Sequence, residues 1–176
     1  MIEMLKSGGI LMIPIILCGL AATYIIIERC VYFSILRKND SKLKVNLKDV
    51  IERNDFATAE SLCDAAGTPF AQVIKKAIQM RKLEERDLKD VVENEIEVVI
   101  PQLEHSLTLL GTIANISTLL GLFGTVTGNI KAFGVLGAGG SMGNPAILAS
   151  AIAEALVTTA GGLFVAIPAM IFNNYF

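Results

Sequence analysis

Three long apolar stretches are separated by polar segments along this chain. They run from Gly8 to Ile27, from Leu107 to Leu136 and from Ala146 to Phe172. Each can form a helix that crosses a lipid bilayer, which takes about 20 apolar residues. Residues 37–105 carry 12 of the 15 Lys and Arg residues and 14 of the 17 Asp and Glu residues. The pattern predicts an all-α membrane protein with three transmembrane helices and one helical domain outside the membrane.

Basic residues set the expected orientation. Six of them follow the first apolar stretch: Arg29, Arg37, Lys38, Lys42, Lys44 and Lys48. Because Lys and Arg accumulate on the cytoplasmic side, the polar domain is expected in the cytoplasm and the N-terminus outside. The first stretch is longer than the apolar core of a signal peptide, and no cleavage motif follows it, which predicts an uncleaved anchor. Pro14 is expected to kink this helix.

The chain is expected to fall into six segments. They are a leader with the first transmembrane helix (1–28), a cytoplasmic helical domain (29–106), a second transmembrane helix (107–136), a periplasmic loop (137–145), a third transmembrane helix (146–172) and the start of a cytoplasmic tail (173–176). Leu47–Arg53 predicts a short amphipathic helix. A helix that begins near Leu83 is expected to bend at Pro101 without ending, so that one long helix extends between cytoplasm and membrane.

Capping residues divide the cytoplasmic domain further. Asn54 or Asp55 is expected to cap a helix over Phe56–Ala66, because a short polar side chain satisfies the free amides of a first turn. Gly67 suits the C-terminal end of this helix, and Thr68-Pro69 suits the start of the next one.

The composition excludes several classes of protein. Basic and acidic residues alternate in the polar domain, which favours a solvated helical face over a phosphate or lipid patch, and no basic tract indicates nucleic acid. The three cysteines are scattered and His105 is the one histidine, so neither a disulfide framework nor a metal site is expected. The sequence has no dinucleotide fingerprint, P-loop or nucleophile–base arrangement, and we expect no enzymatic activity.

The second apolar stretch is unusually polar for a membrane helix. Thr118, Gly121, Thr125 and Gly128 share one helix face, and Gly124 with Gly128 forms a GxxxG pattern. Small residues let helices approach closely in lipid, which is the favoured interpretation. Hydroxyl groups on one side could instead line a wet path, and this alternative stays open. Lys131, the lone cation of this stretch, lies near its outer end and is expected to extend to the membrane interface.

The third apolar stretch contains a single charged residue, Glu154. It lies about 12 Å into the stretch, where a carboxyl group costs at least about 2.5 kcal/mol. Thr158 shares its face, and Thr159 lies about 140° around the helix from it. An acid at this depth favours a proton-linked function, and the alternative is a structural carboxyl bonded to a neighbouring helix. For both threonines the alternative is a hydrogen bond to a carbonyl one turn earlier.

Small residues are dense around these polar groups. They include Gly161 and Gly162, and a helix of this kind is expected to pack against several others. Three membrane helices offer few such neighbours within one chain. We therefore expect the chain to form a homo-oligomer.

Two sequence motifs resemble the ExbB/TolQ/MotA proton-channel family. They are GLFGTVTGNIKAF at residues 121–133 and IAEALVTTAGGLFVAIPAMIFNNYF at residues 152–176, in this order after a cytoplasmic helical insertion. The three expected membrane helices resemble the ExbB and TolQ branch. The resemblance implies pore threonines at Thr125 and Thr159, a buried acid at Glu154 and a helix-bending proline at Pro168. Thr158 stands beside the second of these threonines, and a shared role for it is left open.

The resemblance also implies an assembly and a function. A homopentameric ring would surround a dimer of single-span subunits of the ExbD or TolR type, and protons would be the coupling ion, with no cofactor. The ring would rotate relative to this dimer in the bacterial inner membrane, with the N-terminus in the periplasm. The motion would pass to a TonB- or TolA-type protein and energise transport through outer-membrane receptors. A TolQ-type role in the Tol-Pal envelope system, or a related machine such as one for gliding, is the alternative.

Overall fold

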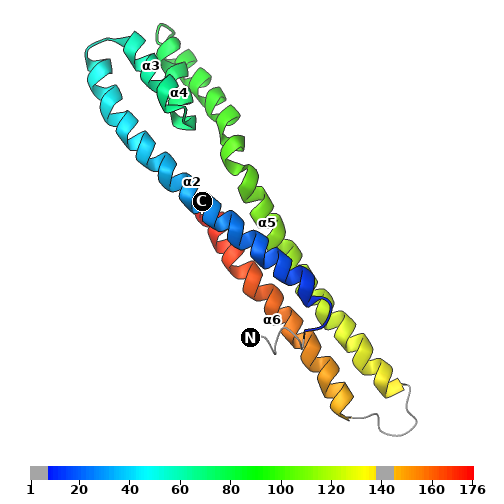
Figure 1. Ribbon diagram of the computed structural model, residues 1–176. Coiled ribbons are helices and arrows are strands. Elements are labelled where there is room, and N and C mark those ends of the chain that lie inside the picture. Colours follow the sequence, from blue (N-terminus) through cyan, green and yellow to red (C-terminus); the bar gives the residue numbers. More distant parts are fainter. Residues whose placement is uncertain (1–7, 138–144) are drawn as a thin grey trace. The chain divides into compact units, whose positions relative to one another are not determined.

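The computed structural model describes residues 8–137 and 145–176. The expected leader at Met1–Ser7 and almost all of the expected outer loop lie outside the described residues. The described part forms helices α2 (Met12–Glu52), α3 (Phe56–Ala66), α4 (Pro69–Gln79), α5 (Glu85–Gly137) and α6 (Pro145–Tyr175), shown in Figure 1. Helix α2, the part of α5 over Ser106–Gly134, and α6 are long and apolar enough to cross a membrane. The all-α fold with three such helices is confirmed.

The chain divides into two compact units. The first, here called the membrane unit, consists of the residues up to Ile27 together with Ser106–Phe176. The second, here called the polar unit, consists of Glu28–His105. Helices α2 and α5 each contribute residues to both units.

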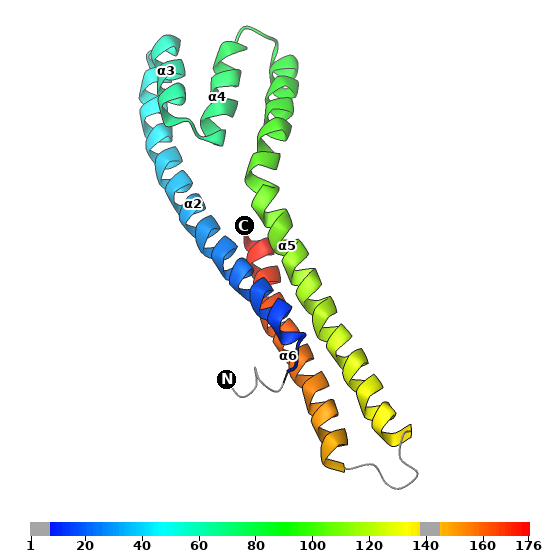
Figure 2. The same cartoon turned by 45° about the vertical axis from the view of Figure 1, so that its right-hand side comes forward.

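Local capping chemistry builds the polar unit. The Asp55 side chain accepts a hydrogen bond from the Thr58 amide at the start of α3, and Gly67 ends this helix in the left-handed conformation with φ 58°. Thr68 caps α4, in which Pro69 is the first residue. Figure 2 shows α3 and α4 beside the end of α2, where apolar residues form a core: Leu43, Leu47, Ala59, Cys63, Ala71 and Ile78.

Two local expectations are wrong and one is confirmed. Leu47–Arg53 forms no separate helix, because α2 continues to Glu52 and buries Leu47 against α3 and α4. Pro14 lies in the first turn of α2, where its missing amide has no intrahelical partner to lose, so the expected kink does not arise. Pro101 lies inside α5 without ending it.

In the membrane unit, α5 and α6 run antiparallel and contact each other through small residues. A Cβ added at Gly128 would lie 2.5 Å from the Cβ of Ala155, and one added at Gly162 would lie 2.5 Å from the carbonyl oxygen of Ser117. Such close approach is typical of membrane helices that pack through small side chains.

Helix α2 runs parallel to α6 in the membrane unit. A Cβ at Gly161 would lie 2.8 Å from the Met12 side chain, and one at Gly19 would lie 3.1 Å from Val165. Further along, buried residues of all three helices form one apolar cluster: Ala22 of α2, Leu110 and Ala114 of α5, and Ala169 of α6.

Candidate functional site

An ion pair joins α5 and α6 inside the membrane unit. The Lys131 ammonium of α5 donates to Oε1 of Glu154 on α6 over 2.8 Å. The side chain of Glu154 is 29% exposed and that of Lys131 is 58% exposed. Both border a pocket of about 360 Å³ together with Ser150 and Ala151. Lys131 was expected to extend to the membrane interface; in the structure its ammonium pairs with the Glu154 carboxylate.

The segment before α2 lies against the same carboxyl group. Gly9 has φ +65°, a conformation that side chains other than glycine rarely adopt. A Cβ at this position would lie 2.9 Å from Cδ of Glu154 and would overlap its Oε1 oxygen. Gly9 therefore allows the backbone to approach the charged side chain of Glu154 closely.

The ion pair holds all the formal charge in the described part of the membrane unit. Among residues 8–27, 106–137 and 145–176, Lys131 and Glu154 are the only Lys, Arg, Asp or Glu side chains. Their charges cancel when both are ionised. A charged group inside a membrane is costly unless it faces protein or water or is paired, and here each charge compensates the other.

The two threonines that follow Glu154 differ in their surroundings. Thr158 is 1% exposed, and its hydroxyl donates to the carbonyls of Glu154 and Ala155, as the back-bonding alternative predicted. The Thr159 hydroxyl instead donates across the helix contact to the Gly121 carbonyl over 2.7 Å. Back-bonding is therefore wrong for Thr159, because the close approach of α5 brings a carbonyl of another helix within reach.

Helix α5 has two distinct faces. Its buried side carries Gly121, Gly124 and Gly128 against α6. Polar residues lie at about 100–240° around the helix from Gly124, which runs from the edge of the α6 contact to the opposite side. These are Thr108, Thr112, Asn115, Thr118, Thr125 and Asn129, of which Thr125 is half-buried and the others are exposed. Measured from Gly124, Gly128 and Gly121 lie at about 40° and 60°, and Thr125 and Thr118 at about 100° and 120°, so the four share one side of the helix as expected. The two glycines contact α6, and the two threonines border that contact.

The remaining predicted residues lie along the helix contacts. Gly124 is opposite Thr158, and Gly162 is opposite Ser117. Gly161 meets α2 at Met12. Pro168 lies inside α6 and borders an apolar groove between α2 and α6. The Thr125 hydroxyl donates to the carbonyl of Leu122 within α5 over 2.7 Å.

Two residues of this site, Lys131 and Gly9, were not assigned to it from the sequence. Lys131 and Glu154 are 23 residues apart, and their pairing depends on the register between α5 and α6. One signal was available: a single cation and a single acid occur in otherwise uncharged apolar stretches, which suggests mutual compensation. Gly9 carried no signal, since nothing local in the sequence indicates what its backbone approaches.

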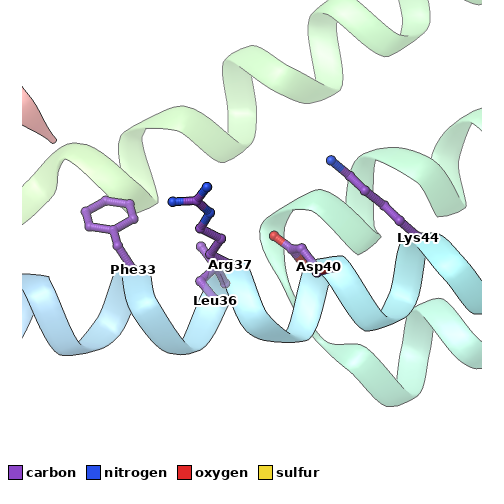
Figure 3. A pocket seen from close by; sticks show the side chains of 6 residues that line it. Phe33, Leu36, Arg37, Asp40 and Lys44 are labelled. Atoms are coloured by element: carbon purple, nitrogen blue, oxygen red, sulfur yellow. The ribbon is translucent and has the colours of Figure 1, made fainter.

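A second pocket, of about 400 Å³, lies along α2 in the polar unit. Figure 3 labels its lining residues Phe33, Leu36, Arg37, Asp40 and Lys44, and Ser41 also lines it. Asp40 accepts a hydrogen bond from the Thr68 hydroxyl over 2.6 Å, and the Lys44 ammonium lies 4.9 Å from the centre of the Phe70 ring. Two of the charges in this pocket are thus engaged by α4, which favours a structural role for them. Within the described residues, no cluster of three or more metal-ligating side chains occurs.

Comparison with known proteins identifies similar chains. The sequence profile described as "MotA/TolQ/ExbB proton channel family" matches residues 65–176. The chain is 29% identical over 171 residues to "Putative biopolymer transport protein ExbB-like 3" of Synechocystis sp., which covers 97% of this chain and 81% of the relative. It is 29% identical over 174 residues to "Biopolymer transport protein ExbB" of Neisseria meningitidis, covering 91% and 77%.

A shorter match has higher identity. The chain is 45% identical over 75 residues to "Tol-Pal system protein TolQ" of Haemophilus influenzae, which covers 43% of this chain and 32% of the relative. The similarity to the ExbB proteins thus extends over almost the whole chain, and the similarity to TolQ is confined to less than half of it.

Proposed function

Because the chain belongs to the MotA/TolQ/ExbB proton channel family, we propose that it is the channel subunit of an ExbB–ExbD-type motor in the bacterial inner membrane. Family membership makes it a multi-pass transport protein of a motor driven by the proton-motive force, and not an enzyme. In our proposal the motor energises TonB-dependent transport across the outer membrane. Because Lys and Arg residues follow the first span, the N-terminus in this proposal lies in the periplasm and the polar unit in the cytoplasm.

One observation carries this proposal: a half-buried carboxylate lies inside a membrane unit that has a single other charge. Glu154 borders a pocket, and one turn further along α6 the Thr159 hydroxyl crosses to α5. Carboxyl groups inside membranes are commonly parts of proton relays. In the proposed role, Glu154 accepts and releases protons that cross the membrane.

The polar face of α5 supports assembly around a central pore. Asn115 and Asn129 are exposed on the side turned away from α6, and Thr118 is exposed at the edge of that side. Uncompensated polar groups are unfavourable in lipid, so this side is expected to face water or another protein chain. A homopentamer with this face toward its centre places Thr125 beside the pore. A dimer of single-span subunits of the ExbD or TolR type would occupy the pore and carry the acid that exchanges protons with the ring.

The proposed cycle converts proton movement into rotation. A proton from the periplasm neutralises an acid of the central dimer beside the threonines, and the ring and dimer then rotate relative to each other. Release of the proton to the cytoplasm restores the charge. One charge that moves through 100 mV supplies about 2.3 kcal/mol, enough to bias such a step. A TonB-type protein would transmit the motion to outer-membrane receptors.

A TolQ-type role is the second candidate, because the match to TolQ reaches higher identity over its shorter range. Affinity purification of the chain from its own host distinguishes the two. Recovery of an ExbD-type subunit with a TonB-type protein supports the proposed role. Recovery of TolR- and TolA-type proteins in their place contradicts it.

Substitution of the two polar groups tests the proton role itself. Glu154→Ala and Thr159→Val are each expected to abolish proton-driven transport while the assembly remains intact in size-exclusion chromatography. Full transport by both variants would contradict the proposed pore role.

A further inference from the structure

The charges of the membrane unit suggest a function for Lys131. We propose that Lys131 is a positioning residue that holds the ionised Glu154 carboxylate between α5 and α6 and is released each time that carboxylate takes up a proton. This inference rests on the proposed role of Glu154 as a proton carrier. In this proposal the Lys131 ammonium competes with protons for the Glu154 carboxylate, and every transported proton must displace it.

The geometry places the cation where it competes with a proton. The ammonium of Lys131 donates to Oε1 of Glu154 over 2.8 Å, and the backbone at Gly9 lies close to the same oxygen. A proton that binds this carboxylate converts it to a neutral carboxylic acid and removes the negative charge that holds Lys131. The pair then changes from net neutral to net +1, and loss of the proton restores it.

The Lys131 side chain has room to move when it is released from Glu154. Lys131 is 58% exposed and lies on a pocket of about 360 Å³ near the end of α5. Its four-carbon stem can stay on the apolar surface while the ammonium moves toward the membrane interface. Uptake of a proton would thus uncouple α5 from α6 at this point, and loss of the proton would couple them again.

No other titratable group of the membrane unit complicates this exchange in the described residues. Glu154 is the one Asp or Glu of α6, Lys131 is the one Lys or Arg in this part of α5, and Gly9 presents only backbone. The other titratable side chains in the described part of the membrane unit are Cys18, Tyr24 and Tyr175. Gly19, next to Cys18, packs against Val165, which is about 16 Å along α6 from Glu154, and Tyr24 lies further still.

Infrared spectroscopy of the purified full chain in liposomes tests the inference directly. The band of a protonated carboxylic acid that disappears in Glu154→Gln reports the proton on Glu154, and its intensity is followed against pH. In Lys131→Met, the proton concentration at half-maximal intensity is expected to fall by about tenfold or more, because a cation within 4 Å no longer opposes protonation. Lys131→Arg keeps the cation and is expected to stay within about threefold of the unsubstituted chain.

A second neutral variant separates the proposed role from a mechanical clamp. Lys131→Gln loses the charge but can still hydrogen-bond to Glu154, and it is expected to show the same shift as Lys131→Met. A normal titration in both neutral variants overturns the inference, even if less protein assembles. The proposed function has its own test, since proton-driven transport that survives Glu154→Gln overturns that function whatever the titration shows.

Discussion

Thr158 fills the space that a side chain at Gly124 would need. A Cβ added at Gly124 would lie 2.6 Å from the Cβ of Thr158 and would overlap its hydroxyl oxygen. Because Thr158 is 1% exposed and bonded to its own helix, it cannot move aside without separating α5 from α6. The absence of a side chain at Gly124 thus sets the distance between the two helices.

Gly124→Ala is therefore expected to destabilise the membrane unit by about 1–3 kcal/mol, the usual cost of overpacking. Thermal unfolding in detergent measures this as a lowered melting temperature. The matched control is Gly134→Ala, also in α5, where an added Cβ meets nothing within 4 Å. This control is expected to be neutral or slightly stabilising, and equal melting temperatures for the two variants would contradict the packing assigned to Gly124.

Thr159→Val is expected to separate stability from transport. The change removes the hydrogen bond to Gly121 at nearly constant volume and is expected to cost about 0.5–1.5 kcal/mol in stability. In the proposed pore the hydroxyl also stabilises a charge, so proton-driven transport is expected to be abolished, although the loss in stability is small.

The measurements for Thr159→Val are melting temperature and proton-driven transport. Thr127→Val serves as control, because the Thr127 hydroxyl donates to carbonyls of its own helix at 3.0 and 3.1 Å. Equal transport by both variants would leave Thr159 a purely structural role.

Gly9→Ala is expected to disrupt the environment of Glu154. The added Cβ overlaps Oε1 of Glu154, and the backbone stays at φ +65° only with strain. Gly67→Ala introduces comparable backbone strain at φ +58° with nothing within 4 Å of the new Cβ. Proton-driven transport is therefore expected to fall in Gly9→Ala and to persist in Gly67→Ala. A similar loss in both variants would point to strain alone.

The first turn of α3 is expected to loosen in acid. Hydrogen bonds from the Thr58 hydroxyl and then from the Thr58 amide hold the pKa of Asp55 below its usual value of 3.8. Because the folded-state pKa is lowered, this stabilisation is present above pH 3.8 and is lost as the pH falls through the lowered value.

Hydrogen exchange of the Thr58 amide measures this loss. Asp55→Asn keeps a capping oxygen without a titrating group, so its protection is expected to be independent of pH in this window. Identical pH dependence in both proteins would contradict the role of the Asp55 charge.

The sequence predicted the elements better than the contacts between them. The caps at Asp55, Gly67 and Thr68 are local, and the structure confirms each of them. The end of α2 was missed because Leu47 is held in a continuous helix by its packing on α3 and α4, which no local pattern reveals.

The candidate site shows the same limit. The spacing of Glu154, Thr158 and Thr159 gave their directions around one helix. It could not tell which carbonyl Thr159 would meet, nor that Lys131 would meet Glu154, because both depend on the register of α5 against α6. The polar and small residues of α5 were placed on one shared side, but the spacing could not tell that the glycines, and not the threonines beside them, would contact α6.

Proton flux through reconstituted complexes tests the central claim most directly. The chain is placed in liposomes together with its single-span partner, a membrane potential is applied, and an internal dye reports the pH. The unsubstituted complex is expected to carry protons, and a Glu154→Gln complex of the same size and amount is expected to show only the background of empty liposomes. Undiminished flux through the Glu154→Gln complex would contradict the account.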